Sequence, residues 1–406
     1  MRSFYFAKRK NSGGAGVSVK TETRLALKIV PAAAILVALA MSSQTRAQTI
    51  TIFDAPGAGT GFLQGTYAFN ISPSGTIIGY SRDANGVRHG FIRSKDGSFT
   101  NFDAPGAGTA AGQGTRAYSI NPAGEITGFF TDSVTAAHGY VRSNQGVITV
   151  FDAPGAGTGP GQGTIVISPL IINPKGAIAG YYIDSSDVKH GFLRDTNGAI
   201  TTFDVPGAGT GPGQGTFSYA ISQTGAITGY YFDSANVSHG FLRDRNGIIT
   251  TFDVPGSGTG FQQGTYGGGF TPNGTIMGNY FDADNLSHGF LMDRNGAFTT
   301  IDAPDAGNVP DSFQGTYPFG INTNGAITGW YVDDANVNHG FVRDKHGALV
   351  EFDVPGAGTG PGQGPNVYSI APNGAVTGFF LDPNNVVHGF VREADGALGL
   401  PKFNGQ

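Results

Sequence analysis

Residues 200–243 read ITTFDVPGAGTGPGQGTFSYAISQTGAITGYYFDSANVSHGFLR. The stretch holds four short runs of β-branched and aromatic residues, the kinds that favour strands: 200–205, 217–222, 226–232 and 239–243. Glycines such as Gly225 stand between the runs, where a tight hairpin turn needs a positive φ. No run keeps helical spacing over about eleven residues, so we expect almost no helix in this part of the chain.

Comparison of the sequence with itself finds seven copies of this unit, which together fill residues 51–396. A Phe-Asp or Ile-Asp pair recurs at intervals of 49 to 52 residues, with its aspartate at Asp54, Asp103, Asp152, Asp204, Asp253, Asp302 and Asp353. A His-Gly pair and a second aspartate recur in step with it. Seven copies in register, each with four short strands, predict one repeat domain over residues 48–403.

These repeats predict an all-β fold, a seven-bladed β-propeller of four-stranded antiparallel blades. A β-solenoid or a stack of hairpins is the alternative, but tight glycine turns favour antiparallel pairing. The early strand Thr49–Ala55 has no blade of its own, so we expect it to pair with His388–Arg392 and close the ring. The tail Ala397–Phe403 is the rival for that place.

A glycine recurs in the middle of the third run of every repeat, where we expect another backbone, that of the next blade, to approach closely. These glycines are Gly79, Gly128, Gly180, Gly229, Gly278, Gly329 and Gly378. The aromatic pairs that follow most of them are interpreted as packing between blades rather than as a carbohydrate platform.

The repeat resembles a known family in three features: an Ile-Asn-Pro-Xaa-Gly turn, an apolar run with Gly-Tyr, and the tripeptide His-Gly-Phe. These features are similar to the extracellular HAF-type repeat, with glycine in place of the alanine of His-Ala-Phe. The resemblance covers all seven repeats and implies a secreted propeller. It implies no catalytic residue.

The N-terminus has the order of a secretory signal. Residues 1–28 carry seven basic residues and one acidic residue, and the uncharged apolar run Ile29–Met41 follows. Thr45 and Ala47 stand at the −3 and −1 positions of a cleavage site. We expect a signal peptide over residues 1–47, cleavage near Ala47 and an exported protein, whether secreted, periplasmic or on the cell surface; an uncleaved anchor is the alternative.

Composition excludes several classes of function. The chain has 406 residues, no cysteine and 13% charged residues, so a disulfide scaffold, a thiol nucleophile and a cysteine-ligated zinc site are excluded. Without residues 1–47 the chain carries 16 basic and 28 acidic residues, a net charge of −12. Nucleic acid is therefore a poor partner. We expect a monomer with no membrane span in the mature chain.

Each repeat offers a histidine between two aspartates, six residues after one and 14 before the other. The set is Asp83, His89 and Asp103; Asp132, His138 and Asp152; Asp184, His190 and Asp204; Asp233, His239 and Asp253; Asp282, His288 and Asp302; Asp333, His339 and Asp353; and Asp382 and His388. A catalytic dyad or part of a metal site is one interpretation. Sevenfold repetition favours the other, a structural hydrogen-bond network, because an enzyme needs a single site.

All changes of repeat length fall between the first and third strands of the pattern, and loops that vary in length often carry binding. The loops that join the first strand of the pattern to the second emerge on one face of the ring, and this face is our candidate ligand face. It carries one loop glutamine per repeat and the only tryptophan, which stands in the least regular repeat: Gln64, Gln113, Gln162, Gln214, Gln263, Gln314, Gln363 and Trp330. Phosphate binding is disfavoured because the glycine-rich loop precedes a strand and lacks lysine. We expect no cofactor; calcium is the alternative left open.

The sequence thus predicts an exported, non-catalytic propeller that acts as a binding or scaffold module. Its partner would be an extracellular polysaccharide or a protein. The alternative is a propeller hydrolase or lyase with a site at the mouth of the central channel. That alternative requires asymmetric acidic or histidine residues from different blades, whereas the sequence shows symmetry.

Overall fold

The computed structural model describes residues 49–271 and 273–394, and this part of the chain is all-β. Its strands are β1 (Ile50–Phe53), β2 (Gly65–Ile71), β3 (Ile77–Arg82), β4 (Arg88–Arg93), β5 (Phe99–Phe102), β6 (Gly114–Ile120), β7 (Ile126–Thr131), β8 (Ala137–Arg142), β9 (Ile148–Phe151), β10 (Gly163–Ile165), β11 (Ile178–Ile183), β12 (Lys189–Arg194), β13 (Ile200–Phe203), β14 (Gly215–Ile221), β15 (Ile227–Phe232), β16 (Ser238–Arg243), β17 (Ile249–Phe252), β18 (Gly264–Phe270), β19 (Ile276–Phe281), β20 (Ser287–Met292), β21 (Phe298–Ile301), β22 (Gly315–Ile321), β23 (Ile327–Val332), β24 (Asn338–Arg343), β25 (Leu349–Phe352), β26 (Gly364–Ile370), β27 (Val376–Leu381) and β28 (Val387–Arg392).

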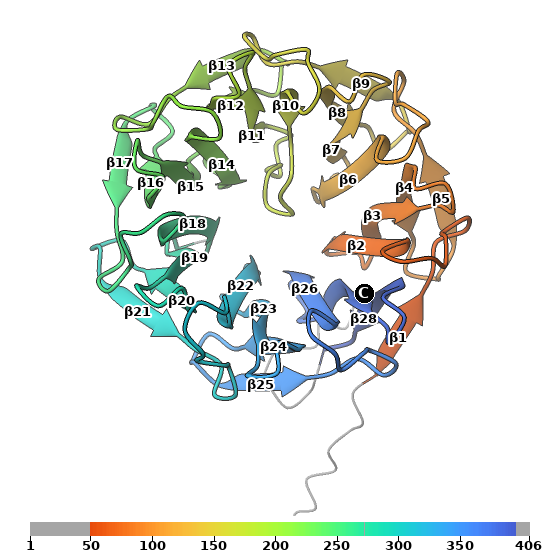
Figure 1. Ribbon diagram of the computed structural model, residues 1–406. Helices are drawn as coiled ribbons and strands as arrows, with labels where there is room; N and C mark the ends of the chain where they lie inside the picture. Colours follow the sequence, from red (N-terminus) through yellow and green to blue (C-terminus); the bar gives the residue numbers. More distant parts are fainter. Residues whose placement is uncertain (1–48, 272, 395–406) are drawn as a thin grey trace, which may run out of the picture. The chain divides into compact units, whose positions relative to one another are not determined.

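The 28 strands form repeating groups of four antiparallel strands. We number the groups in chain order: group 1 is β2–β5, group 2 is β6–β9, group 3 is β10–β13, group 4 is β14–β17, group 5 is β18–β21, group 6 is β22–β25, and group 7 is β26–β28. Figure 1 shows the groups arranged around a centre, with the first strand of each group innermost and the fourth outermost. The expected leader (1–47) and the rival strand Ala397–Phe403 lie outside the described residues.

The first strand of the described chain pairs with the last. β1 is antiparallel to β28, with Ile50 opposite Arg392 and Phe53 opposite Gly389. β1 pairs with β28 in the way that β5 pairs with β4 and β9 pairs with β8, so it stands as the outer strand beside group 7 (Figure 1). Segments from the two ends of the described chain therefore share one antiparallel ladder.

Glycine makes the close contact between neighbouring groups. Gly65 has a φ of 121°, and a Cβ atom there would collide with the backbone of Val387 in β28. The first glycine of each later inner strand is placed in the same way; Gly114, for instance, pairs with Arg88. The close approach between groups thus lies at the start of the inner strand.

The mid-strand glycines approach a different backbone from the one expected. A Cβ atom on Gly79 would collide with the carbonyl of Tyr67 on β2, inside the same group. It would also lie 3.0 Å from the Phe91 ring. The expectation that these glycines face the next blade is wrong: they make room within a group, where the inner strand bulges between Ala68 and Asn70.

The core lies within and between the groups. Phe91, Phe192, Phe241, Phe290 and their counterparts on the third strand of each group have no exposed surface. They are the aromatic residues of the His-Gly-Phe motifs, and they pack in the hydrophobic core. Among the described residues, no helix is long and apolar enough to cross a membrane.

Candidate functional site

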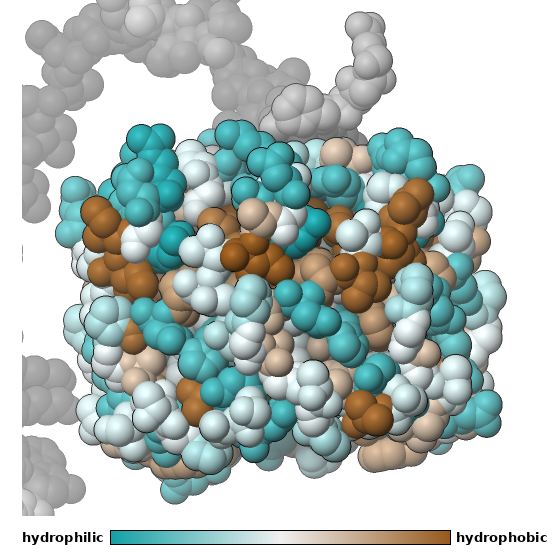
Figure 2. All heavy atoms as spheres, turned by 90° about the horizontal axis from the view of Figure 1, so that it is seen from above, coloured by the Kyte–Doolittle hydropathy of each residue, from teal (hydrophilic) through white to brown (hydrophobic). Residues whose placement is uncertain are grey.

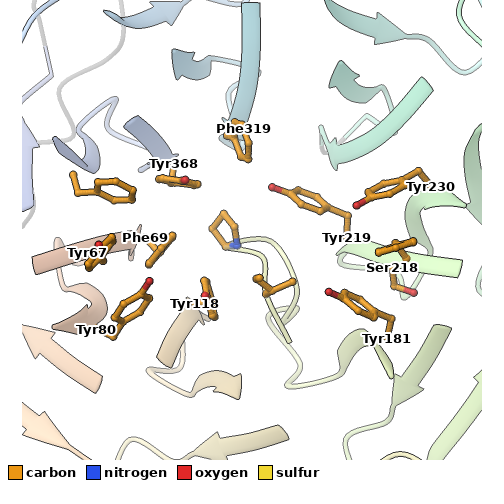
Figure 3. Close-up of a pocket in the computed structure, with 14 residues that line it drawn as sticks. Tyr67, Phe69, Tyr80, Tyr118, Tyr181, Ser218, Tyr219, Tyr230, Phe319 and Tyr368 are labelled. Carbon is orange, nitrogen blue, oxygen red and sulfur yellow. The ribbon is translucent and has the colours of Figure 1, made fainter. Parts of the chain in front are cut away.

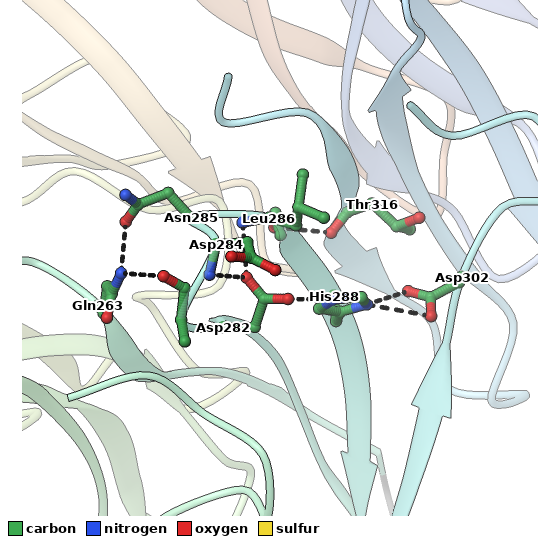
Figure 4. A network of polar contacts seen from close by, with 10 residues as sticks. Gln263, Asp282, Asp284, Asn285, Leu286, His288, Asp302 and Thr316 are labelled. Carbon is green, nitrogen blue, oxygen red and sulfur yellow. Dashed lines mark hydrogen bonds and ion pairs between the residues drawn. The ribbon is translucent and has the colours of Figure 1, made fainter. Parts of the chain in front are cut away.

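The face of the molecule that carries the long loops also carries the histidines; we call it the loop face. Figure 4 shows the arrangement in group 5. His288 Nδ1 lies 3.2 Å from both carboxylate oxygens of Asp302, and its Nε2 lies 3.5 Å from Asp282 Oδ2. The other carboxylate oxygen of Asp282 accepts hydrogen bonds from the backbone N–H groups of Asp284 and Leu286, each at 2.9 Å. One histidine therefore joins the turn before its strand to the outer strand.

The same geometry occurs in every group. The Nδ1 atoms of the seven histidines lie 2.7–3.2 Å from the aspartate of the outer strand, and Nε2 lies 3.4–3.9 Å from the aspartate of the turn. The seven sets are Asp83–His89–Asp103, Asp132–His138–Asp152, Asp184–His190–Asp204, Asp233–His239–Asp253, Asp282–His288–Asp302, Asp333–His339–Asp353 and Asp382–His388–Asp54. Asp54 of β1's own loop completes the last set, so this contact joins the two ends of the described chain.

The imidazole rings are held on a third side by aromatic rings. His190 stacks on Tyr182 with centroids 4.8 Å apart, and five other histidines stack in the same way at 5.0–5.2 Å. In group 1, Ser81 stands opposite His89 in place of the aromatic residue. That histidine has the most exposed side chain of the seven, at 33%.

The carboxylates change the acidity of this network. The hydrogen bond that His288 donates to Asp302 raises the pKa of His288 against the opposing effect of partial burial, and the bond to Asp353 does the same for His339. For Asp184, burial opposes ionisation. Backbone hydrogen bonds from Val188 and Ser186, together with the His190 contact, nonetheless hold the pKa of that carboxyl below its ordinary value. In each set the two ring nitrogens face the carboxylates of two different aspartates.

The loop glutamines of the candidate ligand face are used inside the loops. The Oε1 atom of Gln263 accepts the N–H of Gly260, and its Nε2 donates to the Ala283 carbonyl and to Asn285 Oδ1. The other six glutamines make the same two kinds of contact. Their amides are thus bonded within the chain and are not presented to a ligand.

Trp330 is not on the surface of the loop face either. It lies on β23 and stacks on Phe319 with centroids 4.3 Å apart, and the Tyr317 and Tyr368 rings lie 5.9 and 5.2 Å away. These rings belong to a cluster at the centre of the molecule. The tryptophan is therefore a member of a half-buried aromatic group.

That cluster lines a cavity of about 420 Å³ at the centre of the ring of strands (Figure 3). Its wall contains Tyr67, Phe69, Tyr80, Tyr118, Ile167, Pro169, Tyr181, Phe217, Ser218, Tyr219, Tyr230, Phe319, Tyr368 and Phe379. The wall residues come from the inner strands, from the second strands of four groups (Tyr80, Tyr181, Tyr230 and Phe379) and from the loop after β10 (Ile167 and Pro169). No charged side chain is among them.

β-Bulges aim five of these rings at the centre. In group 4 the pairing of β14 with β15 shifts between Ser218 and Ala220, which leaves Tyr219 without a strand partner. A bulge re-aims the side chain of its extra residue. The same shift occurs at Phe69, Tyr118, Phe319 and Tyr368. The two remaining groups depart from this pattern, with Ile167 and Gly268 at the corresponding positions.

The tyrosine hydroxyl groups in the wall stay protonated. Burial raises the pKa of Tyr181 to about 12, and burial followed by the neighbouring Tyr80 raises that of Tyr67 to about 12. Burial also raises the pKa of Tyr219, Tyr230 and Tyr368. The wall therefore offers neutral hydrogen-bonding groups set among aromatic faces.

A second cavity of about 440 Å³ lies at the other end of the inner strands. Isoleucines and turn residues of several groups line it, Ile71 and Asn121 among them. Among the described residues, Pro169 is the single residue that belongs to the walls of both cavities. On the outer side shown in Figure 2, hydrophobic residues lie in separate groups among hydrophilic ones.

The central cavity was not predicted from the sequence. The aromatic pairs were interpreted as packing between blades. In the pairs Tyr181-Tyr182 and Tyr230-Tyr231 the first ring instead lines the cavity, and the second ring packs on a histidine. A signal was present: the fourth residue after the first glycine of the inner strand is aromatic in five repeats. Among residues 49–271 and 273–394, no group of three His, Cys, Asp or Glu side chains is placed to hold a metal ion.

Comparison with known proteins supports the fold class. The chain is similar to the BP39L lectin from Burkholderia pseudomallei, at 11% identity over 84% of this chain and 96% of that chain, with a TM-score of 0.51. It is also similar to TolB from Acinetobacter baumannii (12% identity, 86% and 80% of the two chains, TM-score 0.44). A third match is the Aleuria aurantia lectin in complex with Fucα1-6GlcNAc, at 13% identity over 75% of this chain and 98% of that chain, with a TM-score of 0.41.

These structures are β-propeller proteins. The BP39L match, with its TM-score of 0.51 and 11% identity, shows the fold alone. No protein-family model matches the chain, and a search of curated proteins gave no match. The resemblance to HAF-type repeats therefore stays a prediction.

Proposed function

We propose that this chain is an exported, seven-bladed β-propeller that binds a saccharide in its central cavity. Closure of the ring into seven blades is supported by the pairing of β1 with β28 and by the contact of His388 with Asp54. Each of these contacts joins the two ends of the described chain. Export is supported by the charge and apolar pattern of residues 1–47. Sequencing the N-terminus of the protein recovered outside the cytoplasm tests that part.

The observation that carries the proposed function is the wall of the central cavity. Its volume of about 420 Å³ lies in the range of small-molecule sites, which are mostly apolar with a few polar groups. Aromatic faces pack on the C–H faces of pyranose rings, and hydroxyl groups such as those of Tyr219 and Tyr368 match sugar hydroxyls. A neutral sugar needs no counter-ion, and the wall has no charged side chain.

The histidine network serves the fold in this proposal. It occurs in all seven groups: Nδ1 of each histidine contacts one aspartate at 2.7–3.2 Å, and Nε2 lies 3.4–3.9 Å from a second. A general base requires a free lone pair near the reacting group. The network therefore joins each turn to its outer strand and leaves ligand binding to the centre.

The hydrolase or lyase alternative receives less support. The described wall of the central cavity has tyrosines and Ser218 as its reactive groups, and no carboxylate or histidine is among its residues. Glycoside hydrolysis by the usual route needs a pair of carboxyl groups across the bond. A protein partner, also predicted from the sequence, is an outcome of the binding test below.

The test is a screen of purified residues 48–406 on a broad array of glycans. Tyr219→Ala is the variant, because this ring projects into the centre in Figure 3. Phe261→Ala is the matched control, because Phe261 is an aromatic residue 69% exposed on a loop away from the cavity wall. We expect retention of at least one neutral glycan, a loss of about tenfold or more in affinity with Tyr219→Ala and no change with Phe261→Ala. Equal retention by the two variants would place the site elsewhere.

A further inference from the structure

The inner strand of group 3 is cut short. β10 has three residues, whereas the other six inner strands have seven. This repeat has three more residues than its neighbours, after Gln162. Residues 166–171, which we call the plug, leave the sheet, and Figure 1 shows the loop after β10 reaching toward the centre.

Three other groups hold the plug by its backbone. The Pro169 carbonyl accepts hydrogen bonds from Asn70 Nδ2 of group 1 at 2.5 Å and from Ser119 Oγ of group 2 at 2.8 Å. The Leu170 carbonyl accepts the N–H of Ile221 in group 4 at 3.0 Å. A loop fastened across the centre by buried hydrogen bonds has one defined position.

Group 5 provides the space that the plug requires. A Cβ atom on Gly269 would lie 2.6 Å from Leu170 Cδ1. Gly269 belongs to the run Gly267-Gly268-Gly269, which stands where group 4 has Ser218, Tyr219 and Ala220. Two departures from the repeat consensus, the longer group 3 and the glycine run of group 5, therefore fit each other.

The plug forms a floor. Pro169 lines the central cavity on one side and the second cavity on the other. Ile167 of the same loop also lines the central cavity and keeps 40% of its surface exposed. The plug thus separates the two cavities and interrupts the axis of the ring.

We propose that the plug makes the central cavity a blind site that takes the terminal unit of a glycan chain. This inference rests on the proposed function and makes it more specific. A chain that binds by an internal stretch must extend beyond the site in two directions. A cavity with a floor leaves one direction for the chain, out through the loop face.

The test is a length series measured by calorimetry on the intact chain. The probes are the methyl glycosides of glucose, galactose, mannose, fucose, xylose and N-acetylglucosamine, and linear oligosaccharides of the same sugars. A methyl glycoside mimics one unit joined to a chain through its anomeric carbon. We expect one of them to bind, with a Kd within about threefold of that of its longest oligosaccharide.

Two outcomes would overturn the inference, and they are distinguishable. A Kd that falls about tenfold or more with chain length, or binding of long chains alone, would show recognition along the chain and leave the proposed function standing. No response to any probe, short or long, would remove the proposed function together with this inference.

A variant separates the plug from the cavity wall. Deleting Ser168, Pro169 and Leu170 brings the repeat to the length of its neighbours and removes the floor. We expect this variant to acquire a length dependence of about tenfold or more, with Tyr219→Ala as the comparison that weakens all lengths equally. An unchanged, length-independent Kd in the folded deletion variant would contradict the role of the plug. Should the deletion variant not fold, the wild-type length series decides.

Discussion

The ring of Phe203 on β13 occupies the space that a side chain on Gly191 of β12 would need: a Cβ atom there would lie 2.6 Å from the ring. Gly191 is the glycine of a His-Gly-Phe motif, and Phe203 belongs to the Phe-Asp motif of the same repeat. The two motifs recur in step because they fit together across one strand pair.

Gly191→Ala is expected to destabilise the protein by about 1–3 kcal/mol, the usual cost of overpacking. Denaturant unfolding measures it. The same substitution is then made in a Phe203→Ile variant, in which the ring is replaced by the residue that group 5 has at this position, Ile301. The alanine should cost less in that background; an equal cost in the two backgrounds would contradict the contact.

The histidine network predicts a pH dependence of stability. The pKa of His288 is raised in the folded protein, so its stabilising contribution is present below the unfolded value and is lost as pH rises through the folded value. His288→Gln should reduce the gain in Tm between about pH 8 and pH 6. The control is His346→Gln, because His346 is exposed on a turn. The same pH slope in both variants would refute the prediction.

Glu351 in group 6 is expected to weaken the fold at neutral pH. Burial, followed by the Asp305 carboxylate, raises the pKa of Glu351, which receives a hydrogen bond from Tyr331 at 3.3 Å. Its ionised form is therefore disfavoured in the folded state. Glu351→Thr, which introduces the residue found at Thr202 and Thr300, should raise Tm near neutral pH. The gain should shrink below about pH 4, where the carboxyl is protonated; a gain independent of pH would speak against this explanation.

The pairing of β1 with β28 predicts an asymmetric effect of trimming the two ends. Removal of residues 48–53 takes away the strand that covers Gly389, against which the Phe53 ring packs. It also exposes the edge of β28, and exposed edges promote aggregation. We expect a large loss in Tm and aggregation on heating. Removal of residues 397–406 should have a smaller effect; the reverse order would assign closure to the tail.

Most of the strand pattern was predictable because the repeats carry it seven times. The run 226–232 corresponds to β15 (Ile227–Phe232), and the run 239–243 to β16 (Ser238–Arg243). The histidine contacts were also predictable, since 14 residues with a tight turn between them bring His239 opposite the outer strand. Periodic spacing fixes contacts of this kind because hairpin register follows from loop length.

The central site was not predictable by the same reasoning. An aromatic residue such as Tyr219 looks like core, and its direction depends on a β-bulge that the sequence does not mark. The three extra residues after Gln162 looked like variation in a surface loop, yet an insertion at the innermost strand has the centre as its nearest open space. The repeat supplies five aromatic rings of the wall through its bulge, and the departures in groups 3 and 5 supply the plug and the space for it.

The glutamines have a role that their sequence pattern did not reveal. Their recurrence on a face of variable loops looked like a ligand-binding pattern. Gln214 instead bonds Gly211 and the Ser234 carbonyl, which fixes the loop to the neighbouring turn. A polar residue that recurs in every repeat is more informative about loop structure than about a ligand.

The measurement that tests the central claim most directly is the fluorescence of Trp330 during titration with the glycans retained in the array screen. Trp330 is the only tryptophan in the chain, and it stacks at 4.3 Å on Phe319, a residue of the cavity wall. A glycan that enters the central cavity should change the emission with a saturable dependence on concentration, and Tyr219→Ala should weaken that response by about tenfold. Binding that leaves the emission unchanged, or that Tyr219→Ala does not affect, would contradict a central saccharide site.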